Sequence, residues 1–153
     1  MAGRSGRASM SACAAVVLAA GSASRMGRPK QVLLFQGEAL VARAVQAASA
    51  SGCDPVIVVL GAHAAAVREV LDSKRVTLVE NLRWETGLSS SIRAGLAAIG
   101  GADNVLLLLA DQPYVTGDLV RRLRKALTDR YLAAACRYEG VVGTPFATAK
   151  TRM

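Results

Sequence analysis

The stretch VVLAAGSASRMGRPK, residues 16–30, carries the first indication of both the fold and the site. Its apolar start predicts a buried strand, and the chain then opens into small residues before two Arg, a Pro and a Lys. The backbone N–H groups of such a loop can approach an anion closely, and Arg25 and Lys30 keep their positive charge near neutral pH. The loop therefore indicates a clamp for a polyphosphate, the alternative being an ordinary strand-to-helix connection with solvated basic residues.

Two familiar phosphate-binding motifs do not describe this loop. A P-loop follows the pattern G-x-x-x-x-G-K-S/T, and counting from Gly21 its second glycine would fall at Met26. A dinucleotide fingerprint follows the pattern G-x-G-x-x-G, and its second glycine would fall at Ala23. The loop therefore needs another explanation.

Composition indicates one globular domain with an anionic partner. The chain has 153 residues, of which 52% are hydrophobic and 20% are charged, so it can bury a core. The net charge of +8 fits nucleotides and phosphates as well as nucleic acid. The basic residues are scattered and only 4% of residues are aromatic, which argues against a nucleic-acid partner. No apolar run reaches the roughly 18 residues of a membrane span, so we expect no membrane partner.

The cysteines and the first residues indicate a cytoplasmic protein. Cys13, Cys53 and Cys136 lie far apart, without metal-ligand spacing, and their odd number does not suit a disulfide framework. We therefore expect buried, reduced thiols. Residues 1–12 are small and polar with two Arg, and the apolar stretch after them is broken by a Gly-Ser pair. We expect this segment to be a disordered leader rather than a signal peptide.

Apolar runs alternate with helical patterns along the chain. Continuously apolar runs predict strands covered on both faces at residues 14–20, 55–61, 76–81, 104–111 and 131–138. Apolar side chains share helical faces in three sets, which are Leu40, Val41, Ala44, Val45 and Ala48; Ile92, Leu96 and Ile99; and Leu119, Leu123 and Leu127. This order predicts an α/β fold with a mostly parallel, doubly wound, Rossmann-like sheet. Ligands of such folds bind beyond the carboxyl ends of the strands.

The pattern L-A-A-G-x-x-x-R-M-G-x-P-K, residues 18–30, resembles the signature of the sugar- and cofactor-nucleotidyltransferases with a glycosyltransferase-A-like fold. Within them it is most similar to the molybdenum-cofactor nucleotidyltransferases, especially the cytidylyltransferase branch. The resemblance implies catalytic roles for Arg25 and Lys30, which would neutralise phosphates. It also implies that the nucleotide is bound by Leu18, Ala19, Ala20, Gly21 and Ser22.

A second segment, ENLRWETGLSSSIRAGL at residues 80–96, resembles the family pattern N-x-x-W/Y-x-x-G-M/L-x-x-S. Serines at a helix start present hydroxyls and free N–H groups, which can bind an anion or a base edge. The alternative is simple helix capping by Ser89. The resemblance implies nucleotide binding by Asn81, Gly87, Ser90 and Ser91.

The run NVLLLLADQP, residues 104–113, ends a predicted strand in Asp111. A carboxylate there lies where the ligand should be, and Mg²⁺ takes one or two carboxylates plus phosphate oxygens. The run resembles the family's strand-terminal D-x-P, which implies that Asp111 is catalytic and holds Mg²⁺. The alternative is an Asp that only accepts hydrogen bonds in a turn.

The resemblance changes near the end of the chain. YEGVVGTP, residues 138–145, is similar to the family's Y-x-G-x-x-G-x-P, and the pattern stops after Pro145. Members of the family carry a later Asp for the metal, which this chain lacks. We therefore expect a nucleotidyltransferase domain over residues 13–145, incomplete at its carboxyl end, and a tail of other origin over residues 146–153.

The expected reaction is the Mg²⁺-dependent transfer of CMP from CTP to a molybdopterin-type phosphate, with release of pyrophosphate. The attacking phosphate oxygen is already ionised, so positioning and charge stabilisation suffice. Three alternatives stay open: an inactive nucleotide-binding remnant that serves a molybdoenzyme partner as an accessory, a related transferase that uses GTP or a sugar or alcohol phosphate, and a nucleic-acid-associated protein.

Overall fold

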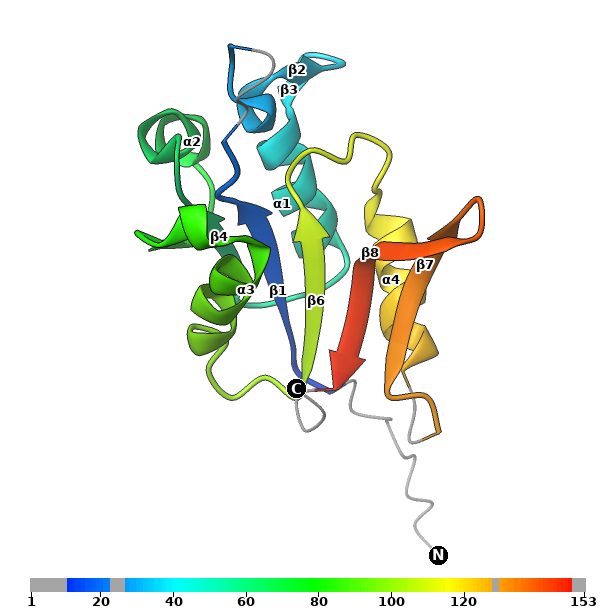
Figure 1. Ribbon diagram of the computed structural model, residues 1–153. Coiled ribbons are helices and arrows are strands. Elements are labelled where there is room, and N and C mark those ends of the chain that lie inside the picture. The colour runs from blue at the N-terminus through cyan, green and yellow to red at the C-terminus, as the bar shows by residue number, and fades with distance from the viewer. Residues whose placement is uncertain (1–10, 23–26, 128–129, 150–153) are drawn as a thin grey trace, which may run out of the picture.

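Six strands form one sheet in the order β5-β4-β1-β6-β8-β7 (Figure 1). The computed structural model describes residues 11–22, 27–127 and 130–149. The strands of the sheet are β1 (Cys13–Ala19), β4 (Val56–Leu60), β5 (Thr77–Glu80), β6 (Asn104–Leu109), β7 (Ala133–Tyr138) and β8 (Val141–Ala149). Strands β5, β4, β1 and β6 are parallel, and β8 runs antiparallel to both of its neighbours. The mostly parallel α/β sheet expected from the sequence is thus confirmed.

The central strands are apolar along their whole length because helices cover both faces of the sheet. All seven residues of β1 and all five of β4 are buried. Alternate residues of β1 face opposite sides, so that Val17 belongs to one core cluster and Val16 to the other. This explains why the strands read as continuous apolar runs rather than alternating ones.

Among the described residues, four helices cover the sheet, three on one face and one on the other (Figure 1). Their bounds are α1 (Leu40–Ala50), α2 (Ala64–Leu71), α3 (Leu88–Ala97) and α4 (Gly117–Ala126). Helices α1, α2 and α4 share one core cluster, and α3 packs against the other. Shorter elements are the 3₁₀ helices η1 (Lys30–Val32) and η2 (Trp84–Thr86) and the strand pair β2 (Leu34–Phe35) and β3 (Glu38–Ala39). None of the helices in these described ranges is long and apolar enough to cross a membrane.

Strand β8 departs from what the sequence predicted. Residues 146–149, which we expected to belong to a tail, form the end of this strand and pair with β6 from Leu107–Phe146 to Asn104–Ala149. The pairing supplies hydrogen bonds to the edge of β6 that β1 leaves free, which gives the segment a place in the sheet. The remaining residues assigned to the leader and the tail, 1–10 and 150–153, lie outside the described residues.

Gly95 lets α3 lie directly on the sheet. A Cβ at this position would come within 3.1 Å of Cγ2 of Val59 and closer still to Cγ1 of Val16. We expect Gly95→Ala to lower the free energy of unfolding by about 1–2 kcal/mol, because overpacking outweighs the gain in helix propensity. Urea denaturation would measure the change. Gly101→Ala is the matched control, since a Cβ there meets nothing within 4 Å, and an equal effect of both changes would contradict the packing argument.

Candidate active site

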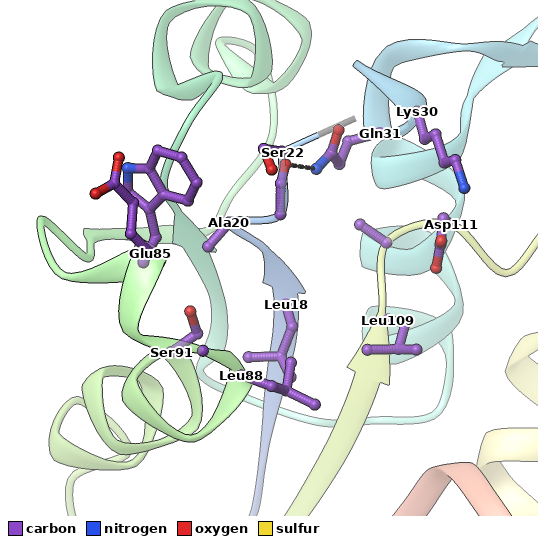
Figure 2. A pocket seen from close by; sticks show the side chains of 14 residues that line it. Leu18, Ala20, Ser22, Lys30, Gln31, Glu85, Leu88, Ser91, Leu109 and Asp111 are labelled. Carbon is purple, nitrogen blue, oxygen red and sulfur yellow. Dashed lines mark hydrogen bonds between the residues drawn. The ribbon is translucent and has the colours of Figure 1, made fainter. Parts of the chain in front are cut away.

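A cleft of about 440 Å³ opens beyond the carboxyl ends of β1 and β6 (Figure 2). These neighbouring parallel strands are where the order of the sheet reverses, since the chain continues from β1 towards β4 and from β6 towards β7. Such a switch point leaves a crevice in open α/β sheets. The cleft is lined by Leu18, Ala20, Gly21, Ser22, Lys30, Gln31, Trp84, Glu85, Gly87, Leu88, Ser91, Leu109, Ala110 and Asp111.

The side chain of Gln31 anchors the end of β1 and the loop after it through hydrogen bonds. Its Nε2 donates to the carbonyl oxygen of Gly21 at 2.8 Å and to that of Ala19 at 3.3 Å. Gln31 is buried, and its Oε1 has no hydrogen-bond partner within the described protein. The side-chain amide thereby binds the last carbonyl group of β1 and one carbonyl group of the loop. Lys30, its neighbour in η1, is exposed and lines the cleft (Figure 2).

Asp111 lies at the cleft two residues after the end of β6, in a turn that two other side chains anchor. Nε2 of Gln112 donates to the carbonyl oxygen of Thr144 in β8 at 2.9 Å. Nη2 of Arg43, from α1, donates to the carbonyl oxygen of Pro113 at 3.4 Å. Asp111 itself is exposed. Its neighbours rather than its own carboxylate therefore anchor the turn.

The opposite wall of the cleft is the start of α3. Gly87 precedes the helix with φ 109°, a backbone conformation that favours glycine, and its carbonyl accepts from the N–H of Ser90 at 3.1 Å. The helix begins at Leu88, so Ser89 lies in the first turn rather than at the cap, and capping by Ser89 is not observed. Ser91 lines the cleft from this turn.

The side chain of Asn81 links the segments of this wall through hydrogen bonds. Its Nδ2 donates to Oγ of Ser90 at 2.8 Å and to Oγ of Ser91 at 3.0 Å, and its Oδ1 accepts from the N–H of Arg83 at 3.0 Å. Asn81 is buried and does not line the cleft. It therefore orients the serines instead of facing the cleft itself.

We expect Asn81→Ala to reduce stability and to loosen the start of α3. Three hydrogen bonds at about 1 kcal/mol each predict a loss of about 2–3 kcal/mol in the free energy of unfolding. Thermal or urea denaturation would measure it. Ser91→Ala is the control, because it removes only the bond from Asn81 to that serine and leaves the bonds to Ser90 and from Arg83. A midpoint unchanged from the parent chain would contradict this role.

The structure brings most of the residues singled out in the sequence into one place. Those that line the cleft are Leu18, Ala20, Gly21, Ser22, Lys30, Gly87, Ser91 and Asp111. Three others, Ala19, Asn81 and Ser90, do not line it. Ala19 faces the opposite side of the sheet from Leu18 and Ala20 and belongs to the other core cluster. Arg25 lies outside the described residues.

Sequence reasoning missed six lining residues, which are Gln31, Trp84, Glu85, Leu88, Leu109 and Ala110. Leu109 and Ala110 are apolar positions of a strand end, and nothing in their residue type marks them as lining a cleft. Trp84 and Glu85 lie inside the segment that had been identified, so an aromatic and an acidic residue between Asn81 and Gly87 could have been added. Gln31 follows Lys30 directly and carried no separate signal.

The fold and this cleft define a class: an α/β protein with a cleft at the switch point of its sheet. The family model for the MobA-like NTP transferase domain matches residues 15–153. The chain belongs to this family. The resemblance to nucleotidyltransferases found in the sequence is thereby confirmed.

Three relatives show how the family varies. Nicotine blue oxidoreductase of Paenarthrobacter nicotinovorans is 39% identical over 109 residues, 71% of this chain and 53% of that protein. The probable molybdenum cofactor guanylyltransferase of Opitutus terrae is 35% identical over 127 residues, 77% of this chain and 59% of that protein. The 2-C-methyl-D-erythritol 4-phosphate cytidylyltransferase of Thermobifida fusca is 37% identical over 126 residues, 76% and 50% respectively. The chain thus spans roughly half to three fifths of the length of these curated relatives.

Solved structures share the architecture. Rv0371c from Mycobacterium tuberculosis H37Rv superimposes with a TM-score of 0.79 at 30% identity, over 93% of this chain and 73% of that one. A structure of Rv0371C in complex with manganese gives a TM-score of 0.72 at 32% identity, over 92% of this chain and 72% of that one. A nucleotidyl transferase from Methanothermobacter has a TM-score of 0.77 at 30% identity, over 90% and 71%.

Proposed function

We propose that this chain transfers CMP from CTP to a molybdopterin-type phosphate and releases pyrophosphate. The observation that carries the proposal is the convergence of Lys30, Asp111 and the loop after β1 on one cleft at the switch point. CTP is proposed from the likeness of residues 18–30 to the cytidylyltransferase branch. GTP is the alternative nucleotide, supported by the guanylyltransferase among the relatives.

The charges around the cleft indicate how the nucleotide lies. Gly21, Ser22 and Lys30 line the cleft, whereas Glu85 lies on the wall formed by η2 and α3 (Figure 2). A phosphate chain is attracted to Lys30 and repelled by the carboxylate of Glu85. We therefore place the phosphates along the loop after β1 and the base towards Trp84 and Ser91. Arg25, outside the described residues, is proposed to neutralise the two phosphates that leave.

Asp111 fits the role of a magnesium ligand. Among the described residues no group of three or more His, Cys, Asp or Glu side chains comes together to hold a metal. Mg²⁺ does not need such a cage, because it uses one or two carboxylates and completes its shell with phosphate oxygens and water. The manganese complex of Rv0371C supports a divalent ion in this fold. When bound by Asp111, the ion would neutralise charge on the triphosphate.

The protein's own groups would act by position and charge. An oxygen of the acceptor phosphate forms a bond to the α-phosphorus of the nucleotide, and the bond from that phosphorus to the bridging oxygen breaks. The attacking oxygen is ionised at neutral pH, so no general base is required. Lys30 would lie beside both phosphates and stabilise the negative charge that accumulates between them. The first-turn N–H groups of α3 and the loop after β1 would hold the substrate in line.

Pyrophosphate release tests this proposal directly. The chain is incubated with Mg²⁺ and a molybdopterin-type acceptor, with CTP and GTP in separate reactions. Nucleotide binding is followed in parallel through Trp84, the single tryptophan of the sequence, which lines the cleft. Pyrophosphate release that requires both the acceptor and CTP supports the proposal. Release with GTP and the acceptor, but not with CTP, would assign GTP as the nucleotide instead. Fluorescence changes without any release would overturn the transferase in favour of a nucleotide-binding remnant.

A second candidate is an oxidoreductase that binds a dinucleotide cofactor in the same cleft. It is favoured by the relative named nicotine blue oxidoreductase, at 39% identity. A dinucleotide also presents phosphates to the loop after β1 and a base to Trp84. Titration of Trp84 fluorescence with reduced nicotinamide dinucleotides would test it against CTP and GTP. Tighter binding of the nicotinamide dinucleotide, with no pyrophosphate released from either triphosphate, would establish this candidate over the transferase.

A further inference from the structure

Two cysteines far apart in the sequence meet at the end of the sheet opposite the cleft. Cys13 is the first residue of β1, and Cys53 lies in the connection from α1 to β4, 40 residues later. Their sulfur atoms are 3.1 Å apart, closer than two sulfurs in ordinary van der Waals contact. Both are buried, as the sequence led us to expect, but their contact was not foreseen.

The groups around the pair shift the pKa values of the two thiols in opposite directions. Oγ of Ser51 lies 3.4 Å from Sγ of Cys53 and donates to the carbonyl oxygen of Ala48 at 2.6 Å, and Nη1 of Arg124 donates to the carbonyl oxygen of Ser51. The hydrogen bond between the two thiols lowers the pKa of Cys53, and the Ser51 hydroxyl and the Arg124 guanidinium act in the same direction against burial. The same hydrogen bond and burial raise the pKa of Cys13. Cys53 is therefore the thiol of the pair that loses its proton more readily.

A second cavity, of about 570 Å³, reaches Cys13 from the surface. Arg121, Arg124 and Lys125 of α4 line it together with Ser51 and Asp54, so three positive side chains face one carboxylate. The exposed fractions of Cys13 and Cys53 are 2% and 4%, so bulky thiol reagents are excluded. The cavity brings a small molecule to Cys13, whose sulfur lies 3.1 Å from that of Cys53. The positive side chains add to the electrostatic environment that favours a thiolate.

A shared metal ion does not explain the pair. Two thiolates on a tetrahedral zinc at Zn–S of about 2.3 Å lie roughly 3.8 Å apart, farther than these sulfurs. The described residues also provide no third His, Cys, Asp or Glu that would complete such a site. The separation instead leaves about 1 Å to the S–S bond length of a disulfide.

We propose that Cys13 and Cys53 form a two-electron redox site, which a small hydroperoxide oxidises to a disulfide. The Cys53 thiolate attacks the peroxide, takes one oxygen to become a sulfenic acid, and with one proton releases water or an alcohol. The Cys13 sulfur then attacks the sulfur of Cys53, its proton leaves with the sulfenic hydroxyl as water, and the S–S bond forms. Two thiols are oxidised and one peroxide is reduced; a dithiol reverses the step.

The disulfide would restrain two segments that lie at the same end of the central sheet. It would join the start of the central strand β1 to the connection between α1 and β4. Closing a loop of this length restricts the unfolded chain, so the oxidised protein is expected to melt at a higher temperature. Because the pair lies outside the cleft, this inference does not depend on the proposed function.

The test uses the whole chain with Cys136→Ser, which leaves only the two cysteines of interest. After hydrogen peroxide treatment we expect the intact mass to fall by two hydrogens, one peptide joining Cys13 to Cys53, a higher melting temperature, and reversal of all three by dithiothreitol. Unchanged thiols, accumulation of sulfinic or sulfonic acid, or bonds between two chains would overturn the proposal.

Single variants assign the two roles. Cys13→Ala is expected to stop at a sulfenic acid on Cys53 that a dimedone-type nucleophile traps, whereas Cys53→Ala is expected to leave Cys13 unmodified under the same treatment. Trapping on Cys13 instead would overturn the assignment of the thiolate. The mass measurement on the Cys136→Ser chain keeps both core cysteines, so the test stands even if these two variants do not fold.

Discussion

Lys30→Ala is expected to lower the rate of pyrophosphate release by about 10²–10³-fold while the fold persists. Lys30 is the exposed charge of η1 at the rim of the cleft, and the expected transition state gathers the charge of two phosphates beside it. The loss of an exposed lysine costs little stability, because its side chain keeps much of its hydration in the folded state. The effect should therefore appear in kcat, measured at saturating nucleotide, and leave the melting temperature nearly unchanged.

Two comparisons sharpen this result. Lys30→Arg keeps the charge with a different shape, so it should retain more activity than Lys30→Ala. Lys74→Ala removes another lysine, one that lies 4.0 Å from Glu38 and away from the cleft, and should leave turnover unchanged. Full activity of Lys30→Ala would remove Lys30 from the proposed mechanism.

Most of the sheet could be predicted because its central strands are buried on both faces. Strands β1, β4 and β6 are continuous apolar runs, and the helices between them follow helical spacing. The predicted helix ends differ from those observed. Leu127, which we expected in the last helix, follows α4 as its C-cap. Ile99, which we expected in the helix before it, is buried but lies beyond the end of α3 at Ala97. Local patterns thus fixed the elements and their order.

Strand β8 and the cysteine pair could not be predicted, because both depend on contacts between distant segments. The sequence of β8 includes Gly143 and Pro145, which weaken a strand pattern, and its partner β6 precedes it by more than thirty residues. Cys13 and Cys53 show no motif spacing and meet only because β1 and β4 are neighbours in register. Pairing of strands, rather than residue type, brings these groups together.

The site was predictable to the extent that its residues belong to short motifs at strand ends. Parallel strands place the loops that follow them at one edge, so Gly21 and Asp111 had to lie near each other. The supporting contacts were not predictable. The bonds of Gln31 to two carbonyl groups and of Asn81 to two serines depend on the geometry of turns that the sequence does not specify.

Asp111→Asn is expected to abolish the response of pyrophosphate release to Mg²⁺ and to lower turnover by at least about 100-fold. The substitution keeps the size of the side chain and removes the charge of a carboxylate, the ligand that Mg²⁺ prefers in the cleft. The turn itself should persist, because Gln112 and Arg43 anchor it through Thr144 and Pro113. The measurement is a Mg²⁺ titration of pyrophosphate release, with Trp84 fluorescence reporting nucleotide binding in the absence of the ion.

The fluorescence arm separates a metal role from a folding role. If Asp111 acts through the ion, Asp111→Asn binds nucleotide without Mg²⁺ at least as well as the parent chain, because one negative charge has left the cleft. If Asp111 only supports the turn, that binding weakens and the melting temperature falls with it. Asp118→Asn is the matched control, since Asp118 pairs with Arg121 on the exposed surface of α4 at 3.2 Å and does not line the cleft. A normal Mg²⁺ dependence in Asp111→Asn would assign the metal to another group.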